Sequence, residues 1–546
     1  MKILVITEKH LVSESQRDGG ARVIQMLESI ESATVKILDF SVISDGRKNP
    51  GTYVYPFSDK CRFRRRLMNK EFVSGIVHNH ISWAEVVVFV HCSMMFGINA
   101  DVVRGTRCVL FPMFTTDSYL HSGENIPAEY YEEESRILQI AELIITPSLV
   151  EKKMLLQRGL SPKKICVISR GVASNSAYVC RSLKPYEPIK CFSLGSIKPQ
   201  KNPQGVLEFF EKIAEQRPGS TLKFIGPIQN EGTEKNLLQV IKNSKFADFV
   251  SICNPIKPSE LSDKLLQYHL HISASLCETF GRAIIETAMM GIPNIILRPN
   301  NAAAPLLGHR LGVTVLENVE EFDAKIWLNS MTLECRSRSL IGLQDIFDEG
   351  FEQSRVVAAI QSESKAVVVD FDGTLYHKNS PSLTKEWVNR VSKYSTVIVC
   401  TARSIESLMP KMIDIGMKWD AVVTFSGGVI TTKGKGDSII SELQKLPNGC
   451  SGVKLGGHLI QAINDREGIK NSQQLRVESY AGKQYFLPWK TTKLRGAVIA
   501  LSQYSHIGRV DCFGDGEHDL PMIHYFGGSI VCSNGLAILP GSDLDE

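Results

Sequence analysis

The sequence has no hydrophobic run long enough to cross a membrane. Its longest apolar region extends from Val86 to Ile98 and is interrupted by His91, whereas a spanning helix needs about 20 apolar residues. The amino-terminal segment offers only the short run Ile3 to Ile6 before polar residues, which is less than the apolar stretch of a secretory leader. We therefore expect a cytoplasmic protein without an integral membrane segment.

A strong excess of one charge is also missing. Lys and Arg number 62 and Asp and Glu number 58, so the formal net charge is only +4 over 546 residues. A field this weak does not favour nucleic-acid binding, and any anion must be recognised locally. The 13 cysteines are odd in number and include no Cys-x-x-Cys pair, which argues against a disulfide framework and a zinc site. We expect reduced thiols.

What the sequence does contain is a repeated alternation of short aliphatic runs with amphipathic stretches. This alternation is typical of βαβ units and parallel sheets. The length allows three to four domains at roughly 150 residues each. A polar, proline-bearing segment from Arg181 to Ile189 and the polar residues Ser362 to Ser364 mark two boundaries. The sequence therefore predicts an α/β protein with domains at 1–185, 186–360 and 365–546.

The aliphatic runs locate the expected strands. In the first domain they are Lys2 to Ile6, Val35 to Leu38, Val86 to Val90, Cys108 to Phe111, Leu143 to Thr146 and Ile165 to Ile168. In the second they are Cys191 to Leu194, Lys223 to Ile225, Val250 to Cys253, Leu270 to Ser273 and Asn294 to Leu297. Each of the first two domains is predicted to be a doubly wound sheet.

The third domain carries the sharpest chemical pattern. Its first strand leads directly into the segment Asp370 to Thr374, which places two carboxylates at the carboxyl edge of a sheet. Thr401 follows a second strand, Lys493 comes later, and Asp515 and Asp519 follow another strand. A nucleophilic carboxylate, an acid, a hydroxyl and a cation for phosphate oxygens, and carboxylates for Mg²⁺ together form a phosphoryl-transfer site.

These residues resemble, in order, the four motifs of the haloacid dehalogenase superfamily of phosphohydrolases, over residues 365 to 535. The resemblance implies that Asp370 attacks phosphorus and forms an aspartyl-phosphate. It also implies that Asp372 protonates the leaving oxygen and then activates water. Thr401 and Lys493 are implied to hold the phosphoryl oxygens, although Lys490 and Arg495 are close enough in sequence to compete with Lys493.

The same resemblance implies a Mg²⁺ cofactor and an inserted cap. The metal would be held by Asp370, Asp515 and Asp519, with a backbone carbonyl from Asp372. The stretch between the second and third motifs exceeds one βα unit, so it is predicted to contain a cap at about 427–487. That is the arrangement of the sugar-phosphate phosphatase branch.

A second pattern lies in the middle domain. Glu278 and Glu286 are separated by seven residues. We expect a helix that begins at Gly281 and stops at Gly291. The amide end of such a helix can bind a diphosphate without a metal. Ionised carboxylates on either side suit the hydroxyl groups of a sugar and of a ribose, because a carboxylate is a pure acceptor.

This stretch resembles the Glu-x7-Glu motif of retaining GT-B glycosyltransferases, over about residues 1 to 350. The resemblance implies that Glu286 binds the ribose, Glu278 the donor sugar and Lys201 the diphosphate. It implies two Rossmann-like domains and no metal for the transfer. The full set of implied donor-binding residues is Gly19, Gly20, Lys201, Glu278, Phe280, Gly281 and Glu286.

The chain departs from this family at several positions. The family usually has Arg where this chain has Ser196 and Asp where it has Ala173, and a histidine usual in the first domain is absent. Lys198 and Arg282 are the two candidates for the missing positive charge. The basic run Arg62 to Arg66 is either a solvated face or a site for an acceptor's phosphate.

Together the resemblances predict a bifunctional enzyme, similar in layout to sucrose-phosphate and trehalose-phosphate synthase/phosphatases. It would transfer a sugar from a nucleotide sugar to a phosphorylated acceptor, such as a sugar phosphate, with retention, and then hydrolyse the phosphate. Two alternatives stay open. In one, the first 350 residues are a nucleotide-sugar-binding regulatory module; in the other, the two activities act on separate substrates in surface-glycan synthesis.

Overall fold

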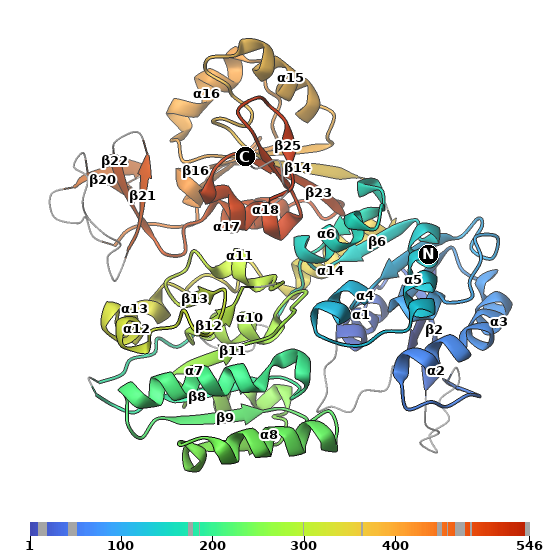
Figure 1. Cartoon of the computed structure of the whole chain (residues 1–546). Helices are drawn as coiled ribbons and strands as arrows, with labels where there is room; N and C mark the ends of the chain where they lie inside the picture. The colour runs from blue at the N-terminus through green and yellow to red at the C-terminus, as the bar shows by residue number, and fades with distance from the viewer. Residues whose placement is uncertain are drawn as a thin grey trace.

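The computed structural model of the chain describes residues 1–8, 19–41, 52–172, 178–184, 186–298, 300–361, 364–444, 450–455, 457–464, 475–480 and 483–540. These residues form three α/β units and one small antiparallel sheet (Figure 1). In Figure 1 the third unit lies above the other two, with the first at the right and the second at the lower left. Among the described residues, no helix has the length and apolar character needed to span a bilayer.

The first unit is a parallel sheet of seven strands in the order β3-β2-β1-β4-β5-β6-β7. Its strands are β1 (Lys2–Glu8), β2 (Thr34–Ser41), β3 (Thr52–Val54), β4 (Val86–Val90), β5 (Arg107–Phe111), β6 (Leu143–Thr146) and β7 (Ile165–Val167). Its helices are α1 (Gly19–Glu28), α2 (Arg62–Met68), α3 (Lys70–Ile81), α4 (Thr116–His121), α5 (Ala128–Ile140) and α6 (Leu149–Gln157).

Strand β1 in the middle of this sheet is apolar from Ile3 to Ile6 because both of its faces are covered. In β1, Ile3 and Val5 join the cluster that contains the buried side chains of α1, whereas Leu4 and Ile6 join the cluster on the opposite face. Alternate side chains of a strand point to opposite faces, so a run of four aliphatic residues supplies both cores.

The second unit is a parallel sheet of six strands in the order β10-β9-β8-β11-β12-β13. Its strands are β8 (Lys190–Leu194), β9 (Thr221–Ile225), β10 (Val250–Cys253), β11 (Leu270–Ser273), β12 (Asn294–Leu297) and β13 (Val313–Leu316). Its helices are α7 (Pro203–Gln216), α8 (Glu231–Asn243), α9 (Leu261–Leu265), α10 (Arg282–Met289), α11 (Ala303–Leu307), α12 (Ala324–Ser330) and α13 (Leu333–Arg338).

Helix α14 (Glu349–Gln361) corrects the predicted boundary at 360. Its residues Val356, Ala359 and Ile360 lie in the core of the first unit, together with Val5. Arg107 of β5 also donates a hydrogen bond to the Ala359 carbonyl (3.1 Å). The chain therefore crosses back to the first unit before the third unit begins. Sequence periodicity does not reveal this crossing, because an apolar helix face has the same pattern whichever unit it packs against.

The third unit is an eight-stranded, mostly parallel sheet in the order β18-β17-β16-β15-β14-β23-β24-β25. Its strands are β14 (Lys365–Asp370), β15 (Thr396–Cys400), β16 (Ala421–Thr424), β17 (Val429–Thr432), β18 (Gly436–Ile439), β23 (Arg509–Gly514), β24 (Ser529–Val531) and β25 (Ala537–Ile538). Its helices are α15 (Pro381–Val391), α16 (Ile405–Asp414), α17 (Lys493–Leu501) and α18 (Leu520–Phe526).

The segment predicted as a cap, about 427–487, divides into two parts. Strands β17 and β18 extend the main sheet as an antiparallel hairpin on β16. A separate four-stranded antiparallel sheet follows, which we call the cap sheet, in the order β19-β20-β22-β21. Its strands are β19 (Ser451–Leu455), β20 (His458–Asn464), β21 (Leu475–Tyr480) and β22 (Lys483–Pro488). The predicted start at 427 is therefore too early, because Val429 and Ile430 are buried against the main sheet.

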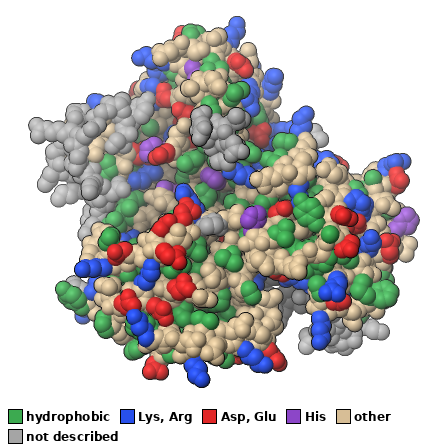
Figure 2. All heavy atoms as spheres, in the orientation of Figure 1, with side chains coloured by type: hydrophobic (Ala, Val, Ile, Leu, Met, Phe, Trp, Pro, Cys, Tyr) green, Lys and Arg blue, Asp and Glu red, His purple; other side chains and the backbone are tan. Residues whose placement is uncertain are grey.

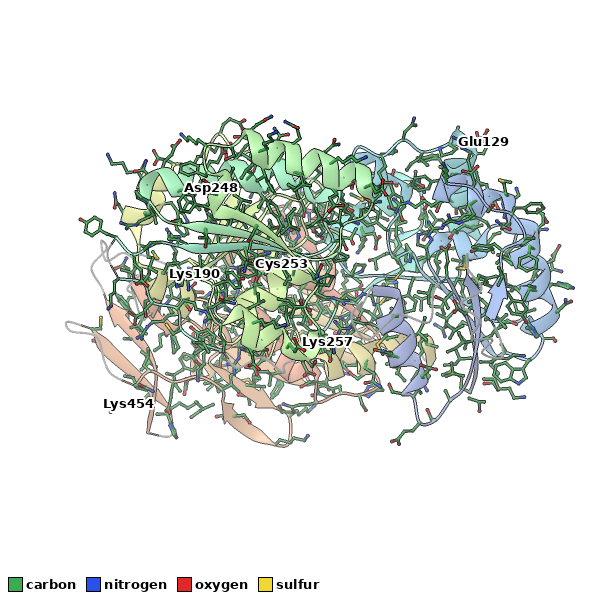
Figure 3. The ribbon with its side chains drawn as sticks, turned by 90° about the horizontal axis from the view of Figure 1, so that it is seen from below. Glu129, Lys190, Asp248, Cys253, Lys257 and Lys454 are labelled. Atoms are coloured by element: carbon green, nitrogen blue, oxygen red, sulfur yellow. The ribbon has the colours of Figure 1, made fainter. Side chains whose placement is uncertain are left out.

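Two views agree on where the cap sheet lies. In Figure 1 it projects beside the third unit, above the second unit. In Figure 3, seen from below, Lys454 of β19 lies on the same side of the molecule as Lys190 and Cys253 of the second unit, away from Glu129 of the first. Figure 2 shows charges of both signs interspersed over the face in view, in keeping with the small net charge.

One hydrophobic core joins the three units. It contains Leu149 from the first unit, Ile284 and Leu306 from the second, and Leu494 and Met522 from the third, all nearly inaccessible to solvent. Burying a large aliphatic side chain contributes about 1.5–3 kcal/mol. The third unit is thus part of the same folded body rather than a loosely tethered addition.

Polar contacts accompany this core at both interfaces of the third unit. The Arg310 guanidinium of the second unit donates to the carbonyls of Ser339 (2.8 Å) and Trp489 (2.7 Å). The Lys152 ammonium of the first unit donates to the Gly527 carbonyl at the end of α18 (2.6 Å). These bonds satisfy buried polar groups and fix the relative positions of the units.

A substitution at Gly527 should weaken the interface with the first unit. Gly527 has φ +69°, and a Cβ added there would lie 2.3 Å from Val167 Cγ2. Gly416 also follows a helix with positive φ (+66°), but an added Cβ would meet nothing within 4 Å. Gly527→Ala is expected to lower the free energy of unfolding by about 1–3 kcal/mol more than Gly416→Ala, since only the first overpacks an interface. Denaturant or thermal unfolding measures this, and equal losses in the two variants would contradict the packing.

Candidate functional sites

The residues singled out in the second unit converge at the carboxyl ends of β8 and β11. These two strands are neighbours at the point where the strand order reverses, which is where doubly wound sheets bind ligands. Strand β8 leads into Ser196 and Lys201, and β11 leads through Ser275 to Glu278. A small pocket at this edge is lined by Gly195, Ser196, Lys201, Ser273 and Ser275, among others.

Lys201 and Glu278 form an ion pair at this edge. The turn after Lys201 is set by Asn202, whose left-handed conformation (φ 46°) begins α7 and whose side chain caps that helix. Burial acts to raise the pKa of Glu278, but Lys201, a hydrogen bond from Ser275 and the charge of Lys198 outweigh burial and lower it. Glu278 is therefore an ionised acceptor held beside a lysine.

Helix α10 begins directly after Gly281, as the glutamate motif predicts. Gly281 has a left-handed conformation (φ +77°), and a Cβ there would lie 3.0 Å from Ala303 Cβ, so a side chain would fit poorly. Phe280 is buried with its ring centroid 6.2 Å from that of Phe347. Glu286 lies half-buried on α10 itself. The helix start and the two glutamates thus occupy one segment next to the edge of the sheet.

Lys198 is the candidate cation that lies near this pair. Its pKa is lowered to about 8, first by burial and next by the charge of Lys201; Arg62 adds to the shift and Glu278 opposes it. Arg62 belongs to α2 of the first unit, so Lys198 faces both units. It provides a positive charge near the position where Ser196 replaces the expected arginine.

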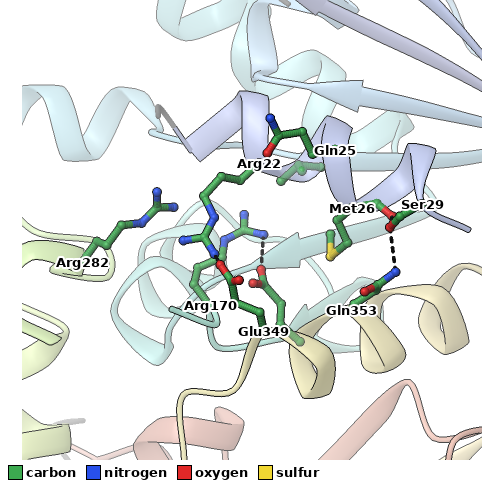
Figure 4. A pocket seen from close by; sticks show the side chains of 10 residues that line it. Arg22, Gln25, Met26, Ser29, Arg170, Arg282, Glu349 and Gln353 are labelled. Carbon is green, nitrogen blue, oxygen red and sulfur yellow. Dashed lines mark hydrogen bonds and ion pairs between the residues drawn. The ribbon is translucent and has the colours of Figure 1, made fainter. Parts of the chain in front are cut away.

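Arg282 points elsewhere. It lines a cavity of about 190 Å³ together with Arg22 of α1 and Arg170 after β7 (Figure 4). Arg170 donates to Glu352 (3.0 Å), and Arg22 pairs with Glu349, both on α14. This cavity lies where α14 crosses between the units, and Arg22 and Arg170 already face carboxylates.

Other predicted positions in the first unit can now be placed. Gly19 and Gly20 are the first two residues of α1, after β1. Ala173 lies outside the described residues. The run Arg62 to Arg66 is not simply a solvated face: Arg62 pairs with Glu124, and Arg66 is buried and donates to Glu8 (2.7 Å).

Four predicted residues of the third unit meet in space. Asp370 ends β14, and Asp515 and Asp519 follow β23, its neighbour at the point where the strand order reverses. The Lys493 ammonium donates to Asp370 Oδ1 (2.5 Å) and to Asp519 Oδ1 (2.8 Å). One carboxylate oxygen from each aspartate lies within 4.8 Å of the others. We call these four residues the carboxylate–lysine cluster.

The electrostatics of the cluster favour a cation. Burial raises the pKa of Asp370 well above its usual value; Asp519 and Asp515 act in the same direction, and Lys493 opposes them. Burial acts to lower the pKa of Lys493, but the two carboxylates outweigh it and raise that pKa well above its usual value. Three carboxylates against one ammonium leave an excess of negative charge on oxygen ligands, the donor type that Mg²⁺ prefers.

Lys493 is the lysine at this cluster because its competitors are engaged elsewhere. Arg495 pairs with Asp345 of the second unit (2.6 Å), and Lys490 packs beside Gly342. Thr492 caps α17 by accepting a hydrogen bond from the Arg495 amide (3.1 Å), which sets Lys493 at the first position of the helix.

The Asp372 carboxylate does not join the cluster. It accepts two hydrogen bonds from Arg403, from Nε and from Nη2, both at 2.7 Å. The prediction that Asp372 contributes its backbone carbonyl to a metal concerns a different atom and stays a prediction. Thr401 is buried at the end of β15, and its hydroxyl accepts a hydrogen bond from the Arg403 amide (3.2 Å). Arg403 was missed from the sequence, although it stands only two residues after Thr401.

A cap-sheet residue also reaches the surroundings of the cluster. Glu478 of β21 is buried; it accepts a hydrogen bond from the Ser426 hydroxyl (2.6 Å) and pairs with Arg476. Ser426 in turn donates its amide to the Thr401 carbonyl (3.0 Å). His518 lies 3.9 Å from Glu478. Sequence patterns did not single out Glu478, because the contact joins the cap sheet to the main sheet only in the folded chain.

Comparisons with known proteins bear on the first two units. Residues 180–326 match the family model for glycosyl transferases group 1. No curated protein sequence matches the chain. A sucrose-phosphate synthase from Thermosynechococcus elongatus has a similar structure, with a TM-score of 0.53 at 14% identity over 65% of this chain and 97% of that chain.

Two further solved structures show the same likeness. WaaG, a glycosyltransferase involved in lipopolysaccharide biosynthesis, has a TM-score of 0.51 at 12% identity, covering 66% of this chain and 100% of its own. OtsA has a TM-score of 0.50 at 11% identity, covering 66% of this chain and 99% of its own. Identities this low indicate a shared fold. Residues 180–326 therefore match the model for glycosyl transferases group 1, and the first two units share with these structures the fold of two Rossmann-like sheets of the GT-B type.

Proposed function

We propose that the protein transfers a sugar from a nucleotide sugar to a phosphorylated acceptor, with retention, and then hydrolyses the phosphate in its third unit. The transfer is supported by the family match and by the Lys201–Glu278 pair beside the start of α10. The hydrolysis is supported by one observation above all: Asp370, Lys493, Asp515 and Asp519 come from separate segments and meet in one cluster.

In the transfer step, the donor diphosphate lies at the amino-terminal end of α10 and against Lys201. Negative charge develops on the leaving diphosphate as the glycosyl bond breaks, and cations and amides already in place stabilise it. Lys198 adds a second ammonium group on the same side. Glu278 accepts hydrogen bonds from the donor sugar, and Glu286 accepts them from the ribose.

In the hydrolytic step, Asp370 attacks phosphorus, and the phosphate ester bond to the acceptor breaks. The leaving oxygen takes a proton from Asp372, which later removes a proton from the water that cleaves the aspartyl-phosphate. Asp372 must therefore give up at least one Arg403 hydrogen bond and gain a proton first. Lys493 and Thr401 hold the phosphoryl oxygens. Bound to Asp370, Asp515 and Asp519, Mg²⁺ would neutralise phosphoryl charge.

Removing the Glu286 carboxylate should impair transfer. Glu286→Ala is expected to lower kcat/KM for nucleotide release by roughly 10- to 150-fold, because hydrogen bonds to a charged group contribute about 1.5–3 kcal/mol. The assay follows nucleoside diphosphate released from a panel of nucleotide sugars in the presence of sugar phosphates. Glu320→Ala, at an exposed position of the second unit, is the matched control. Release that is unchanged in Glu286→Ala would remove the transferase assignment.

The lowered pKa of Lys198 predicts a pH dependence of donor use. Below pH 8 the ammonium is protonated and attracts the diphosphate; above it the proton is lost, since its pKa is about 8. The kcat/KM for the donor should therefore fall as pH rises through about 8. Lys198→Arg should abolish this fall because arginine stays charged, whereas Lys235→Arg on the exposed face of α8 should keep it. If kcat/KM still falls with pH in Lys198→Arg, the titration of another group causes the fall.

The Asp370→Asn variant tests whether the two steps act in sequence. It is expected to lose release of inorganic phosphate while nucleotide release continues, so that mass spectrometry shows a phosphorylated glycoside accumulating. Chelation of Mg²⁺ should have the same effect, and Asp414→Asn, at an exposed position of the same unit, should behave as the unaltered protein.

Two other results of that experiment have distinct meanings. Phosphate release that continues in Asp370→Asn would refute the assignment of the carboxylate–lysine cluster. Nucleotide release without any phosphorylated glycoside would instead favour separate substrates for the two units.

A further inference from the structure

The second unit reaches the edge of the carboxylate–lysine cluster. Helix α18 begins directly after Asp519, and α11 of the second unit packs against it. The loop after α11 is held on its other side by Arg310, which is fully buried and donates to the Trp489 carbonyl (2.7 Å). His309 stands between these two anchored points. Its backbone is therefore fixed relative to the third unit.

His309 is exposed to solvent. Desolvation by neighbouring protein atoms lowers the pKa of His309 well below its usual value, and the positive charges of Arg310, Arg476 and His518 lower it further. Arg476 belongs to the cap sheet, and His518 lies between Asp515 and Asp519. Three parts of the fold thus face one another here: the second unit, the cap sheet and the loop that carries two aspartates of the cluster.

The cap-sheet side of this region is also held in place. Glu478 is tied to Ser426 by a hydrogen bond (2.6 Å), pairs with Arg476 and lies 3.9 Å from His518. Lys493 is close enough to Glu478 to contribute to its lowered pKa, although burial acts in the opposite direction. Figures 1 and 3 both place the cap sheet on the side of the second unit.

The chemistry of these side chains selects one kind of ligand. Arg476 and Glu478 balance each other's charge, so the group does not suit a second phosphate. It offers both donors and acceptors of hydrogen bonds instead, from a guanidinium, a carboxylate and imidazoles. Such a mixture fits vicinal hydroxyl groups, as in a sugar ring.

We propose that His309, Arg476, Glu478 and His518 form a subsite for the glycosyl part of a sugar phosphate whose phosphate lies at the carboxylate–lysine cluster. This inference rests on the proposed phosphatase function of the third unit. The preference for a phosphorylated glycoside would then depend partly on a residue of the glycosyltransferase half, and the two halves would share a substrate-recognition surface.

The test compares three substrates of two kinds in the full-length protein with Mg²⁺. One is p-nitrophenyl phosphate, whose leaving group carries no sugar hydroxyls; the others are sucrose phosphate and trehalose phosphate. We expect His309→Ala to lower kcat/KM for the disaccharide phosphates by about tenfold, mainly through KM, because one or two hydrogen bonds are lost. Hydrolysis of p-nitrophenyl phosphate should be unchanged. His309→Gln, which keeps a donor and an acceptor, should restore part of the loss.

The outcomes separate this inference from the proposed function. If the unaltered protein hydrolyses none of these esters, the phosphatase function itself fails. If it hydrolyses p-nitrophenyl phosphate but His309→Ala changes both kinds of substrate equally, or neither, the subsite is refuted. The subsite is also refuted if the unaltered protein shows no preference for either disaccharide phosphate over p-nitrophenyl phosphate. His506→Ala, at an exposed histidine of the third unit, is the matched control and should alter neither reaction.

Discussion

Helix α18 packs on α11 of the second unit, while its terminal Gly527 lies against Val167 of the first. This packing fixes the three units relative to one another. The core around it contains Ile284 of α10 and Met522 of α18, so the start of α10 and the loop before α18 belong to one rigid arrangement. Phe280, next to Gly281, contacts Phe347, which in turn contacts Tyr525. Their ring centroids are 6.2 Å and 5.9 Å apart, respectively. Because such a core is closely packed, a displacement of one side chain is passed on to its neighbours.

Both candidate sites follow the same architectural rule and differ in charge. Each lies where the order of a mostly parallel sheet reverses, between β8 and β11 in one case and between β14 and β23 in the other. At the first, two lysines flank one carboxylate, which favours an anionic ligand. At the second, three carboxylates surround one lysine, which favours a cation that can in turn bind phosphate. Opposite charge balances on similar scaffolds thus point to different chemistry.

The sequence predicted the main strands. It also named residues that the structure brings together, Asp370, Lys493, Asp515 and Asp519 among them; their roles stay predictions. Strands β4, β6, β10, β11 and β12 match their expected bounds. In β4, β6 and β12 the reason is that buried parallel strands are runs of mainly aliphatic residues. Strands β3 and β24 were missed; each is only three residues long, too short to show a period. Arg403 and Glu478 were missed because their partners, Asp372 and Ser426, lie far away in the chain.

What the sequence determined by itself is local: the α/β class, the strand ends that carry Asp370, Asp515 and Glu278, and the helix start at Gly281. These depend on short-range patterns of burial and backbone freedom, which neighbouring residues specify. Only the tertiary structure decided that α14 crosses back to the first unit, that Lys198 rather than Arg282 lies near Glu278, and that α11 packs on α18. Those outcomes depend on which apolar surfaces pack against each other in the folded chain. Contacts between segments far apart in the chain leave no pattern in a single sequence.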